Sequence, residues 1–328
     1  MADISDISAE EIAHLEELIG VLRRRLRLLD IQLAKIAGNP SAVAQISFER
    51  EEVEQQLRTA LANLRRLRPS PISDQSPYLG LLTFQEANAH LFFGRDALIA
   101  NLLERVRRSP FLAVLGASGS GKSSAVRAGL LPMLKGGALP GSETWRYITL
   151  KPGARPLDAL AVELMKLQNA DLSQALTLSQ QLAENDRAFL LSLDLLLDRA
   201  AGQRLVLVID QFEELWTQMP LEEGARAAFL SQQQRPFIER LLAVFTAPDT
   251  PLMVVLTMRL DFLDEAADNP ALAQAISEHN VIVSPMSPDE LREMIVRPVE
   301  LAGGDFEPGL VDELIEQGQR GALPLLEY

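Results

Sequence analysis

The sequence predicts an α/β fold in which a parallel β-sheet is flanked by helices and preceded by an α-helical hairpin. Apolar segments suggest strands at 111–115, 145–150, 205–209, 252–257 and 281–283, and long amphipathic stretches such as 187–201 and 236–245 separate them. This alternation is typical of a parallel sheet that helices cover on both faces. The continuous apolar run LVLVI is typical of a strand that is buried on both sides. A heptad pattern in the first 68 residues indicates the hairpin.

Composition narrows the class of protein. The chain has 328 residues, of which 47% are hydrophobic and 23% charged, enough for a sizeable core and more than one domain. Its net charge of −14 argues against a nucleic-acid surface spread over the whole protein, and we predict no direct nucleic-acid partner. The absence of cysteine excludes disulfides, thiolate metal sites and cysteine nucleophiles.

The sequence also bears on location. The N-terminus, MADISDISAEE, is polar and acidic, unlike a secretory signal or a transit peptide. No apolar run approaches the ~18 residues that cross a bilayer. We therefore expect a cytoplasmic protein with no membrane partner.

Residues 1–68 are predicted to form the helical hairpin. The first helix carries apolar residues at alternating spacings of three and four, the pattern of a heptad seam: Ile12, Leu15, Ile19, Leu22, Leu26, Leu29, Leu33 and Ile36. Gly38, Asn39 and Pro40 interrupt it, and the second helix has its own stripe: Val53, Leu57, Ala60, Leu64 and Leu67. A two-helix hairpin has little interior, so we expect this stripe to pack against a partner as well. The alternative is that the hairpin folds back on the main domain. Residues 69–77, PSPISDQSP, are predicted to be a linker.

The strongest chemical signal is the segment FLAVLGASGSGKSS at 111–124. It contains G-x-x-x-x-G-K-S between a predicted strand and a helix-compatible run, which is the context that a phosphate-binding loop requires. Glycines let successive backbone N–H groups face a phosphate, and the helix N-terminus adds partial positive charge. Lys122 is predicted to reach the β- and γ-phosphates and Ser123 to ligate Mg²⁺. The predicted nucleotide-binding residues here are Gly116, Ala117, Ser118, Gly119, Ser120, Gly121, Lys122, Ser123 and Ser124.

A second signal is LVLVIDQFEELW at 205–216. The apolar strand presents Asp210 at its carboxyl end, where open α/β sheets bind ligands. Asp210 is predicted to hold Mg²⁺ through a water. Gln211 stands where a glutamate usually follows, so Glu213 and Glu214 are the candidates for orienting the attacking water. The alternative is that both only cap the following helix.

A third signal lies at the end of the predicted strand LMVVLTMR. The polar residue Thr257 is followed two positions later by Arg259, and arginine binds phosphate oxygens bidentately. We predict that this pair senses the γ-phosphate. The predicted catalytic residues are thus Lys122, Asp210, Glu213, Glu214 and Arg259.

From about Tyr78 to Tyr328 the sequence resembles the STAND ATPases, in particular the bacterial novel STAND NTPases. The resemblance rests on the leader PYLGLLTFQEANAHLFFGRD, on GASGSGKSS, VIDQFEELW and LTMRLDFL, and on the terminal GALPLLEY. It implies a P-loop NTPase fold of the ASCE/AAA+ type over 78–285, and VSPMSPDELREMIVRP resembles the family's helical lid over 286–328. It also implies ATP/ADP as nucleotide, with Phe93, Gly94 and Arg95 against adenine and ribose and Pro324 against adenine. The family's Gly-x-Pro motif is altered here, since Ala322 precedes Pro324 by two.

The resemblance implies partners too. Relatives continue into sensor repeats, which we expect in the full-length protein, with the lid truncated at Tyr328. The hairpin resembles modules that recruit effectors such as caspase-like proteases in bacterial conflict systems. We expect an ATPase that hydrolyses slowly and acts as a signalling or antiviral-defence switch, forming a homo-oligomer when ATP is bound. The alternatives are a scaffold with structural ADP and a metabolic kinase or motor ATPase.

Overall fold

The computed structural model describes residues 4–35, 40–67, 78, 80, 82–246, 250–304, 306–307 and 309–319. The described chain forms two compact units. The first comprises residues within Met1–Leu82, His90–Ala100 and Met286–Tyr328, and the second comprises Thr83–Ala89 and Asn101–Pro285. The nucleotide-binding domain predicted at 78–285 includes residues 90–100, which the division into compact units assigns to the first unit. The domain boundaries stay predictions. The described helices all lack the length or the apolar character needed to cross a bilayer.

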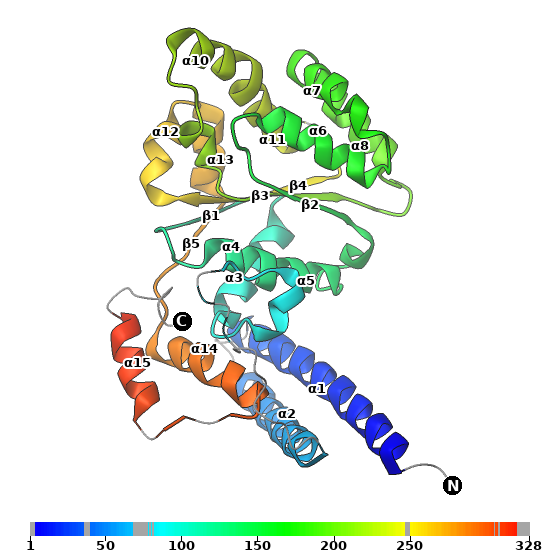
Figure 1. Cartoon of the computed structure of the whole chain (residues 1–328), viewed down its shortest axis with the longest axis vertical. Helices are drawn as coiled ribbons and strands as arrows, with labels where there is room; N and C mark the ends of the chain where they lie inside the picture. Colours follow the sequence, from blue (N-terminus) through cyan, green and yellow to red (C-terminus); the bar gives the residue numbers. More distant parts are fainter. Residues whose placement is uncertain are drawn as a thin grey trace. The chain divides into compact units, whose positions relative to one another are not determined.

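The second unit contains a five-stranded parallel sheet, as predicted (Figure 1). Its strands are β1 (Phe111–Gly116), β2 (Arg146–Leu150), β3 (Leu205–Ile209), β4 (Leu252–Arg259) and β5 (Asn280–Ile282). Their order across the sheet is β2-β3-β4-β1-β5. β4 lies between β3 and β1, with Ile209 opposite Leu256 and Gly116 opposite Arg259. The chain segments that leave β1, β3 and β4 therefore start from one edge of the sheet.

Helices cover both faces of the sheet (Figure 1). One face packs its alternate strand residues, including Leu115, Ile209 and Leu256, into a large core with several helices. These helices are α6 (Pro156–Leu167), α7 (Ala175–Glu184), α8 (Asp186–Leu196), α11 (Arg235–Thr246) and α13 (Pro270–Glu278). On the opposite face lie α3 (Asp96–Arg108), α4 (Lys122–Ser124), a π-helical segment (Ala125–Leu130) and α5 (Leu131–Lys135).

Shorter elements connect these layers. The short α-helices are α9 (Glu214–Thr217), α10 (Glu223–Phe229) and α12 (Leu263–Ala267). The 3₁₀ segments are Glu86–Leu91, Ser142–Thr144, Leu172–Gln174 and Leu260–Phe262, and a second π-helical segment spans Leu230–Gln234.

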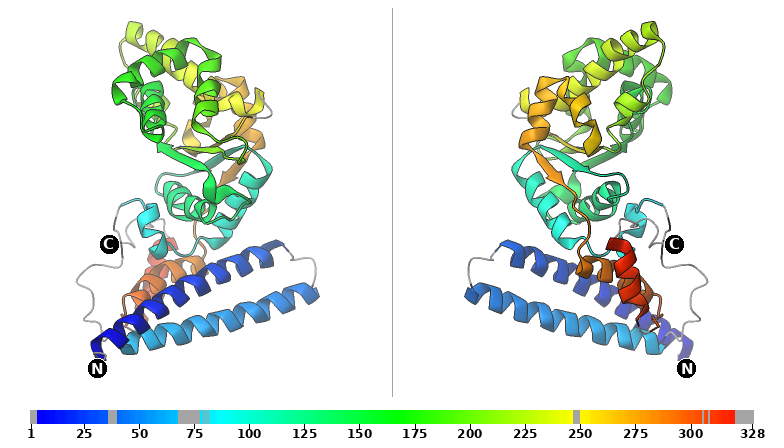
Figure 2. Two further views of the ribbon diagram at one scale, coloured as in Figure 1. Left: turned by 90° about the vertical axis from the view of Figure 1, so that its right-hand side faces the viewer. Right: turned by 90° about the vertical axis from the view of Figure 1, so that its left-hand side faces the viewer.

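In the first unit, α1 (Ile4–Lys35) and α2 (Pro40–Leu67) lie side by side as a hairpin (Figure 2). Their shared core consists of the seam residues predicted from the heptad pattern: Leu15, Ile19, Leu22, Leu26, Leu29, Val53, Leu57 and Ala60. Arg25 and Glu49 join the two helices by an ion pair of 2.7 Å. Residues 36–39 and the side chains of Ile12, Ile36, Leu64 and Leu67 lie outside the described residues.

The lid segment of the first unit consists of α14 (Pro288–Leu301) and α15 (Leu310–Gln319). A capping box of Ser287 and Glu290 begins α14. The apolar core of this pair is formed by Met286, Leu291, Met294, Ile295 and Ile315. The Tyr78 hydroxyl donates to the Ile295 carbonyl at 2.6 Å, and burial raises the pKa of Tyr78 to about 12. Residues 69–77 and Pro324 lie outside the described residues.

Candidate nucleotide-binding site

The loop after β1 has a backbone that glycine makes possible. Gly119 and Gly121 have φ angles of 73° and 85°, in the left-handed region that favours glycine. A Cβ atom at Gly116 would lie 2.7 Å from the Ser120 hydroxyl oxygen, so the tight turn has no room for a side chain. The predicted phosphate-binding loop thus curls between β1 and α4.

Lys122, the first residue of α4, is buried, and its amine returns to the loop. Its Nζ donates to the carbonyl oxygens of Gly116 at 3.0 Å and Ala117 at 2.6 Å. Burial lowers the pKa of Lys122, while the nearby charges of Glu213 and Asp210 act in the opposite direction. The arrangement places a cationic group inside the predicted phosphate-binding loop.

The predicted pair of Ser123 and Asp210 is brought together by the sheet. Asp210 follows β3 and is 2% exposed, and its Oδ1 accepts a hydrogen bond of 2.6 Å from Ser123 Oγ. The Thr257 hydroxyl donates to the same oxygen at 2.7 Å. Arg127 forms an ion pair of 2.9 Å with Oδ2. Thr257 Oγ1 in turn accepts from the Gln211 amide at 3.0 Å. Two hydroxyl groups and one guanidinium group therefore hold the Asp210 carboxylate in place.

These residues fit a magnesium ion. Mg²⁺ prefers oxygen ligands and is commonly held by one or two carboxylates together with substrate phosphates and water. Ser123 Oγ and the Asp210 carboxylate provide such oxygens next to the phosphate-binding loop. Within the described ranges, no three His, Cys, Asp or Glu side chains gather to hold a metal ion by themselves. The donor set is therefore that of a cation bound together with a nucleotide.

A strained turn follows Asp210 and directs Glu213 inward. Gln211 has a φ of 57°, which is uncommon for a residue with a side chain. Glu213 is 9% exposed, and its Oε2 accepts from the Arg259 amide at 3.4 Å. Burial raises the pKa of Glu213, and the charges of Lys122 and Arg259 partly oppose this. The alternative was that Glu213 only caps the following helix, but its side chain makes no capping hydrogen bond to α9.

Glu214 is directed elsewhere. Its Oε2 accepts from the amide of Gly153, in the segment that follows β2, at 3.1 Å. The sequence left both glutamates open as the water-orienting residue. The geometry favours Glu213, whose charge interacts with that of Lys122.

Arg259, the predicted γ-phosphate sensor, is held by a neighbour. Its Nε and Nη2 donate to the two carboxylate oxygens of Asp261 at 3.0 and 2.5 Å. Its guanidinium carbon also lies 5.2 Å from the centre of the Phe262 ring. This hydrogen bonding with Asp261 raises the pKa of Arg259. Arg259 therefore stands at the carboxyl end of β4 beside Glu213, with its planar donors turned to Asp261.

Arg127 is a site residue that sequence reasoning missed. Besides Asp210, it contacts Gln85, whose Oε1 accepts from Nη1 at 2.8 Å. No motif contains it, but its position was informative, because a residue four after Ser123 on a helix lies on the same face. A cation at that position points to an acidic partner near Ser123.

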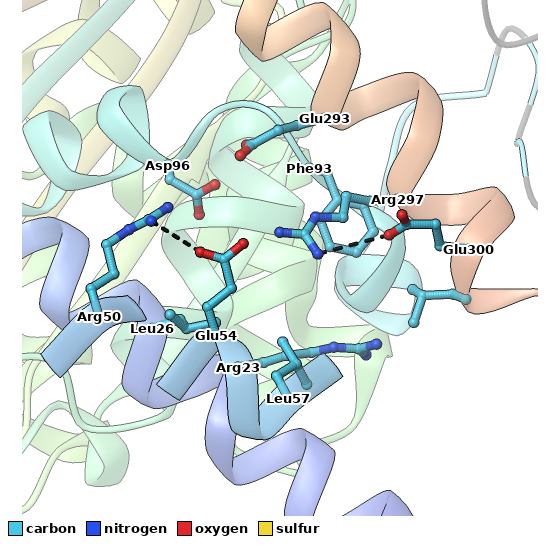
Figure 3. A pocket seen from close by; sticks show the side chains of 11 residues that line it. Arg23, Leu26, Arg50, Glu54, Leu57, Phe93, Asp96, Glu293, Arg297 and Glu300 are labelled. Atoms are coloured by element: carbon cyan, nitrogen blue, oxygen red, sulfur yellow. Dashed lines mark hydrogen bonds and ion pairs between the residues drawn. The ribbon is translucent and has the colours of Figure 1, made fainter. Parts of the chain in front are cut away.

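Phe93, Gly94 and Arg95, which are predicted to lie against adenine and ribose, are in the first unit beside α14. Gly94 has a φ of 76°, and a Cβ atom there would lie 2.2 Å from the Glu290 carbonyl oxygen. Arg95 is buried; burial lowers its pKa and the charge of Glu290 opposes this. The Phe93 ring lines a pocket near Arg297 and the hairpin residue Leu57 (Figure 3). The Phe-Gly-Arg motif is thus packed against the first turn of the lid helix.

Comparison with known proteins adds to this geometry. No curated protein matches the chain. Solved structures that resemble it include a Walker-type ATPase of Pyrococcus abyssi, at 17% identity over 76% of this chain and 69% of that one, with a TM-score of 0.48. Cdc6p from Pyrobaculum aerophilum matches at 15% identity over 79% and 62%, with a TM-score of 0.41. The ORC2 protein of Aeropyrum pernix, solved in ADPNP–ADP complexes, matches at 12% identity over 71% and 59%, with a TM-score of 0.45. The chain thus spans between 59% and 69% of the length of these proteins.

A family model gives the more specific result. The model described as Novel STAND NTPase 1 matches residues 77–328, which include the phosphate-binding loop, Asp210, Arg259 and the lid segment. The match covers well over half of the chain and confirms the resemblance found in the sequence. The chain therefore belongs to the Novel STAND NTPase 1 family and is a P-loop ATPase.

Proposed function

We propose that this chain is a molecular switch that binds ATP and ADP with Mg²⁺ and hydrolyses ATP slowly. The observation that carries the proposal is the contact between Ser123 and Asp210, 2.6 Å apart, beside the buried amine of Lys122. A hydroxyl, a carboxylate and a cation in this arrangement match the needs of a triphosphate with its metal ion.

Each residue has a distinct part in this proposal. Lys122 neutralises charge on the β- and γ-phosphates, and the loop amides bind the phosphate oxygens. Ser123 and Asp210 hold Mg²⁺, which supplies charge neutralisation between the phosphates when bound. Glu213 orients the attacking water, because its carboxylate is the one that interacts with Lys122. Arg259 binds the γ-phosphate after leaving Asp261.

The choice of base is part of the proposal. We propose adenine as the base, with Phe93, Gly94, Arg95 and Pro324 as the residues in contact, and membership of an NTPase family supports a nucleotide at this site. The packing of Gly94 on the Glu290 carbonyl supports a link between this motif and the lid, because one cannot shift without the other.

We also propose that ATP favours an oligomer that presents the hairpin to an effector protein, in bacterial signalling or defence. Support comes from the outer surface of the hairpin, where several large apolar side chains are exposed: Leu18, Val21, Leu28 and Phe48. Such residues are candidates for contact with a partner. A trigger would start the exchange of ADP for ATP.

Calorimetric titration with ATP and Mg²⁺ tests the binding site. Lys122→Ala is expected to weaken ATP binding about ten- to hundredfold, because a charge-assisted contact to phosphate is lost. Lys166→Ala, which removes an exposed lysine paired with Glu163 on α6, is the control and should bind like the parent. Unchanged affinity in Lys122→Ala would contradict the proposed site. Permanently bound ADP that neither exchanges nor forms by hydrolysis would indicate the structural scaffold instead.

A further inference from the structure

One guanidinium group joins the proposed magnesium carboxylate to the leader segment Thr83–Ala89. Arg127 pairs with Asp210 Oδ2 at 2.9 Å through Nη2 and donates to Gln85 Oε1 at 2.8 Å through Nη1. Its side chain is 20% exposed and that of Asp210 3%. The ion pair is therefore largely shielded from water, which strengthens it relative to a surface pair.

The helix that carries Arg127 has an unusual geometry. Residues Ala125–Leu130 are π-helical, and the Leu131 amide donates to the Val126 carbonyl five residues back. π-Helical turns are rare in proteins overall, but those that occur are often found at functional sites. They change the direction of the side chains that they carry. Here the π-turn begins two residues before Arg127 and directly after the loop's Ser123 and Ser124.

The leader segment is held on this helix by further polar contacts. The Phe84 amide donates to Ser124 Oγ at 3.2 Å, and Lys135 pairs with Glu86 at 2.6 Å. Of the three residues that hold the leader in these contacts, Arg127 is the one that also forms an ion pair with Asp210. The leader ends at Ala89, and the chain enters the other unit at His90, within the 3₁₀ segment Glu86–Leu91. A change at Asp210 that releases Arg127 therefore weakens one of the contacts that hold the chain segment connecting the two units.

We propose that Arg127 is a positioning residue that competes with the magnesium ion for Asp210 and thereby couples metal binding to the order of the leader. The inference rests on the proposed function of Asp210. Oδ1 already accepts two hydroxyl donors, so the cation and Arg127 share the charge of one carboxylate. A divalent cation there repels the guanidinium, weakens its ion pair and frees Gln85. By linkage, loss of Arg127 strengthens cation binding by the same coupling.

The experiment measures Mg²⁺ affinity and leader order separately on the 328-residue chain. Mg²⁺ affinity is obtained by titrating Mg²⁺ into the ADP complex, and leader order by hydrogen–deuterium exchange of peptides covering 83–89, with EDTA and with Mg²⁺. In the parent, Mg²⁺ is expected to increase exchange of the leader. In Arg127→Met, exchange is high and insensitive to Mg²⁺, and Mg²⁺ binds about fivefold tighter or more.

Two further variants separate the two contacts of Arg127. Gln85→Ala should increase exchange of the leader and strengthen Mg²⁺ binding less than Arg127→Met does, because the pair with Asp210 remains and only the contact with Gln85 no longer opposes the release of Arg127. Arg127→Lys should keep Mg²⁺ affinity near that of the parent but lose the link to the leader, because one ammonium group cannot replace the two-sided guanidinium. Lys135→Ala is the control: it loosens the leader through Glu86 but leaves its response to Mg²⁺ intact.

The outcomes are distinguishable. If Arg127→Met binds Mg²⁺ as weakly as the parent or more weakly, or if its leader still responds to Mg²⁺, the coupling through Arg127 is wrong. If Arg127→Met does not fold, Gln85→Ala tests the proposal instead. A leader that exchanges in Gln85→Ala as it does in the parent would overturn the proposal. If the parent ADP complex does not bind Mg²⁺ at all, the proposed function of Asp210 falls together with this inference.

Discussion

Burial determines the chemistry of Glu213 at the scale of a single residue. Its carboxylate is 9% exposed and lies near the charges of Lys122 and Arg259, yet burial dominates and raises its pKa. A group whose folded pKa is raised binds its proton more readily in the folded than in the unfolded chain. Folding stability therefore falls as pH rises from the ordinary glutamate pKa through the raised one.

Glu213→Gln is accordingly expected to remove most ATP hydrolysis and to stabilise the fold at neutral pH. The neutral amide avoids the cost of a buried charge, so the gain in stability appears above the raised pKa and vanishes below the ordinary glutamate pKa. Unfolding midpoints measured against pH, with the partly exposed Glu163→Gln as control, check this. A gain that is constant with pH would contradict the assigned cause, and unchanged hydrolysis would remove Glu213 from its role.

A second prediction concerns Asp261, which binds both donor groups of Arg259. Asp261→Asn weakens this pairing and releases Arg259 toward a γ-phosphate. ATP affinity is expected to rise about two- to fivefold relative to ADP affinity, a modest change because exposed ion pairs contribute little. Competition titrations with ATP and ADP measure the ratio. Asp264→Asn, an equal change of charge on α12, serves as the control, and an identical ratio in both variants would show that Asp261 does not restrain Arg259.

Single residues also mark the limit of prediction from sequence. Lys122, Ser123 and Asp210 were predictable because a strand, a loop and a helix must follow one another around a phosphate-binding loop. Arg127 was not, because its contact with Asp210 joins positions 83 apart in sequence and depends on a π-turn. Local propensity does not specify such a turn, since it is set by packing around the helix.

At the scale of elements, Gly94 fixes the contact between its loop and α14. Gly94→Ala places a Cβ atom 2.2 Å from the Glu290 carbonyl oxygen, where neither backbone can yield easily. Gly153→Ala is a matched control, because Gly153 also has a positive φ, of 59°, but has open space around it. Urea unfolding is expected to show Gly94→Ala about 1–3 kcal/mol less stable than Gly153→Ala, the usual cost of overpacking. Equal losses in both variants would mean that only the backbone angle matters.

The elements themselves were largely readable from the sequence. The strand LVLVI is predicted and observed at 205–209, because an apolar run that is buried on both faces has few other structures open to it. The seam of the hairpin was equally predictable, since Leu22, Leu26 and Val53 occupy heptad positions. The run after the phosphate-binding loop was predicted only to be helix-compatible, and the structure divides this helix around a π-turn. Its hydrophobic pattern is compatible with a regular and with a divided helix, so periodicity alone could not reveal the division.

At the scale of the whole molecule, the proposed switch has its phosphate and metal contacts in one unit and its hairpin and predicted lid in the other. Such a switch needs the two nucleotides to differ in their free energy of binding to its two states. In the proposed function Arg259 and Lys122 supply the difference, because both would contact the γ-phosphate that ADP lacks. The expected consequence is assembly in ATP but not in ADP, through the exposed apolar residues of the hairpin.

The most direct test of the switch is the molar mass of the chain in solution, measured by light scattering in Mg²⁺ with ADP and with ATP. The Glu213→Gln variant is included because it is expected to keep ATP intact during the measurement. We expect one chain per particle in ADP and a larger mass in ATP, most clearly in Glu213→Gln. An identical mass in both nucleotides, for parent and variant alike, would contradict nucleotide-driven assembly of this chain.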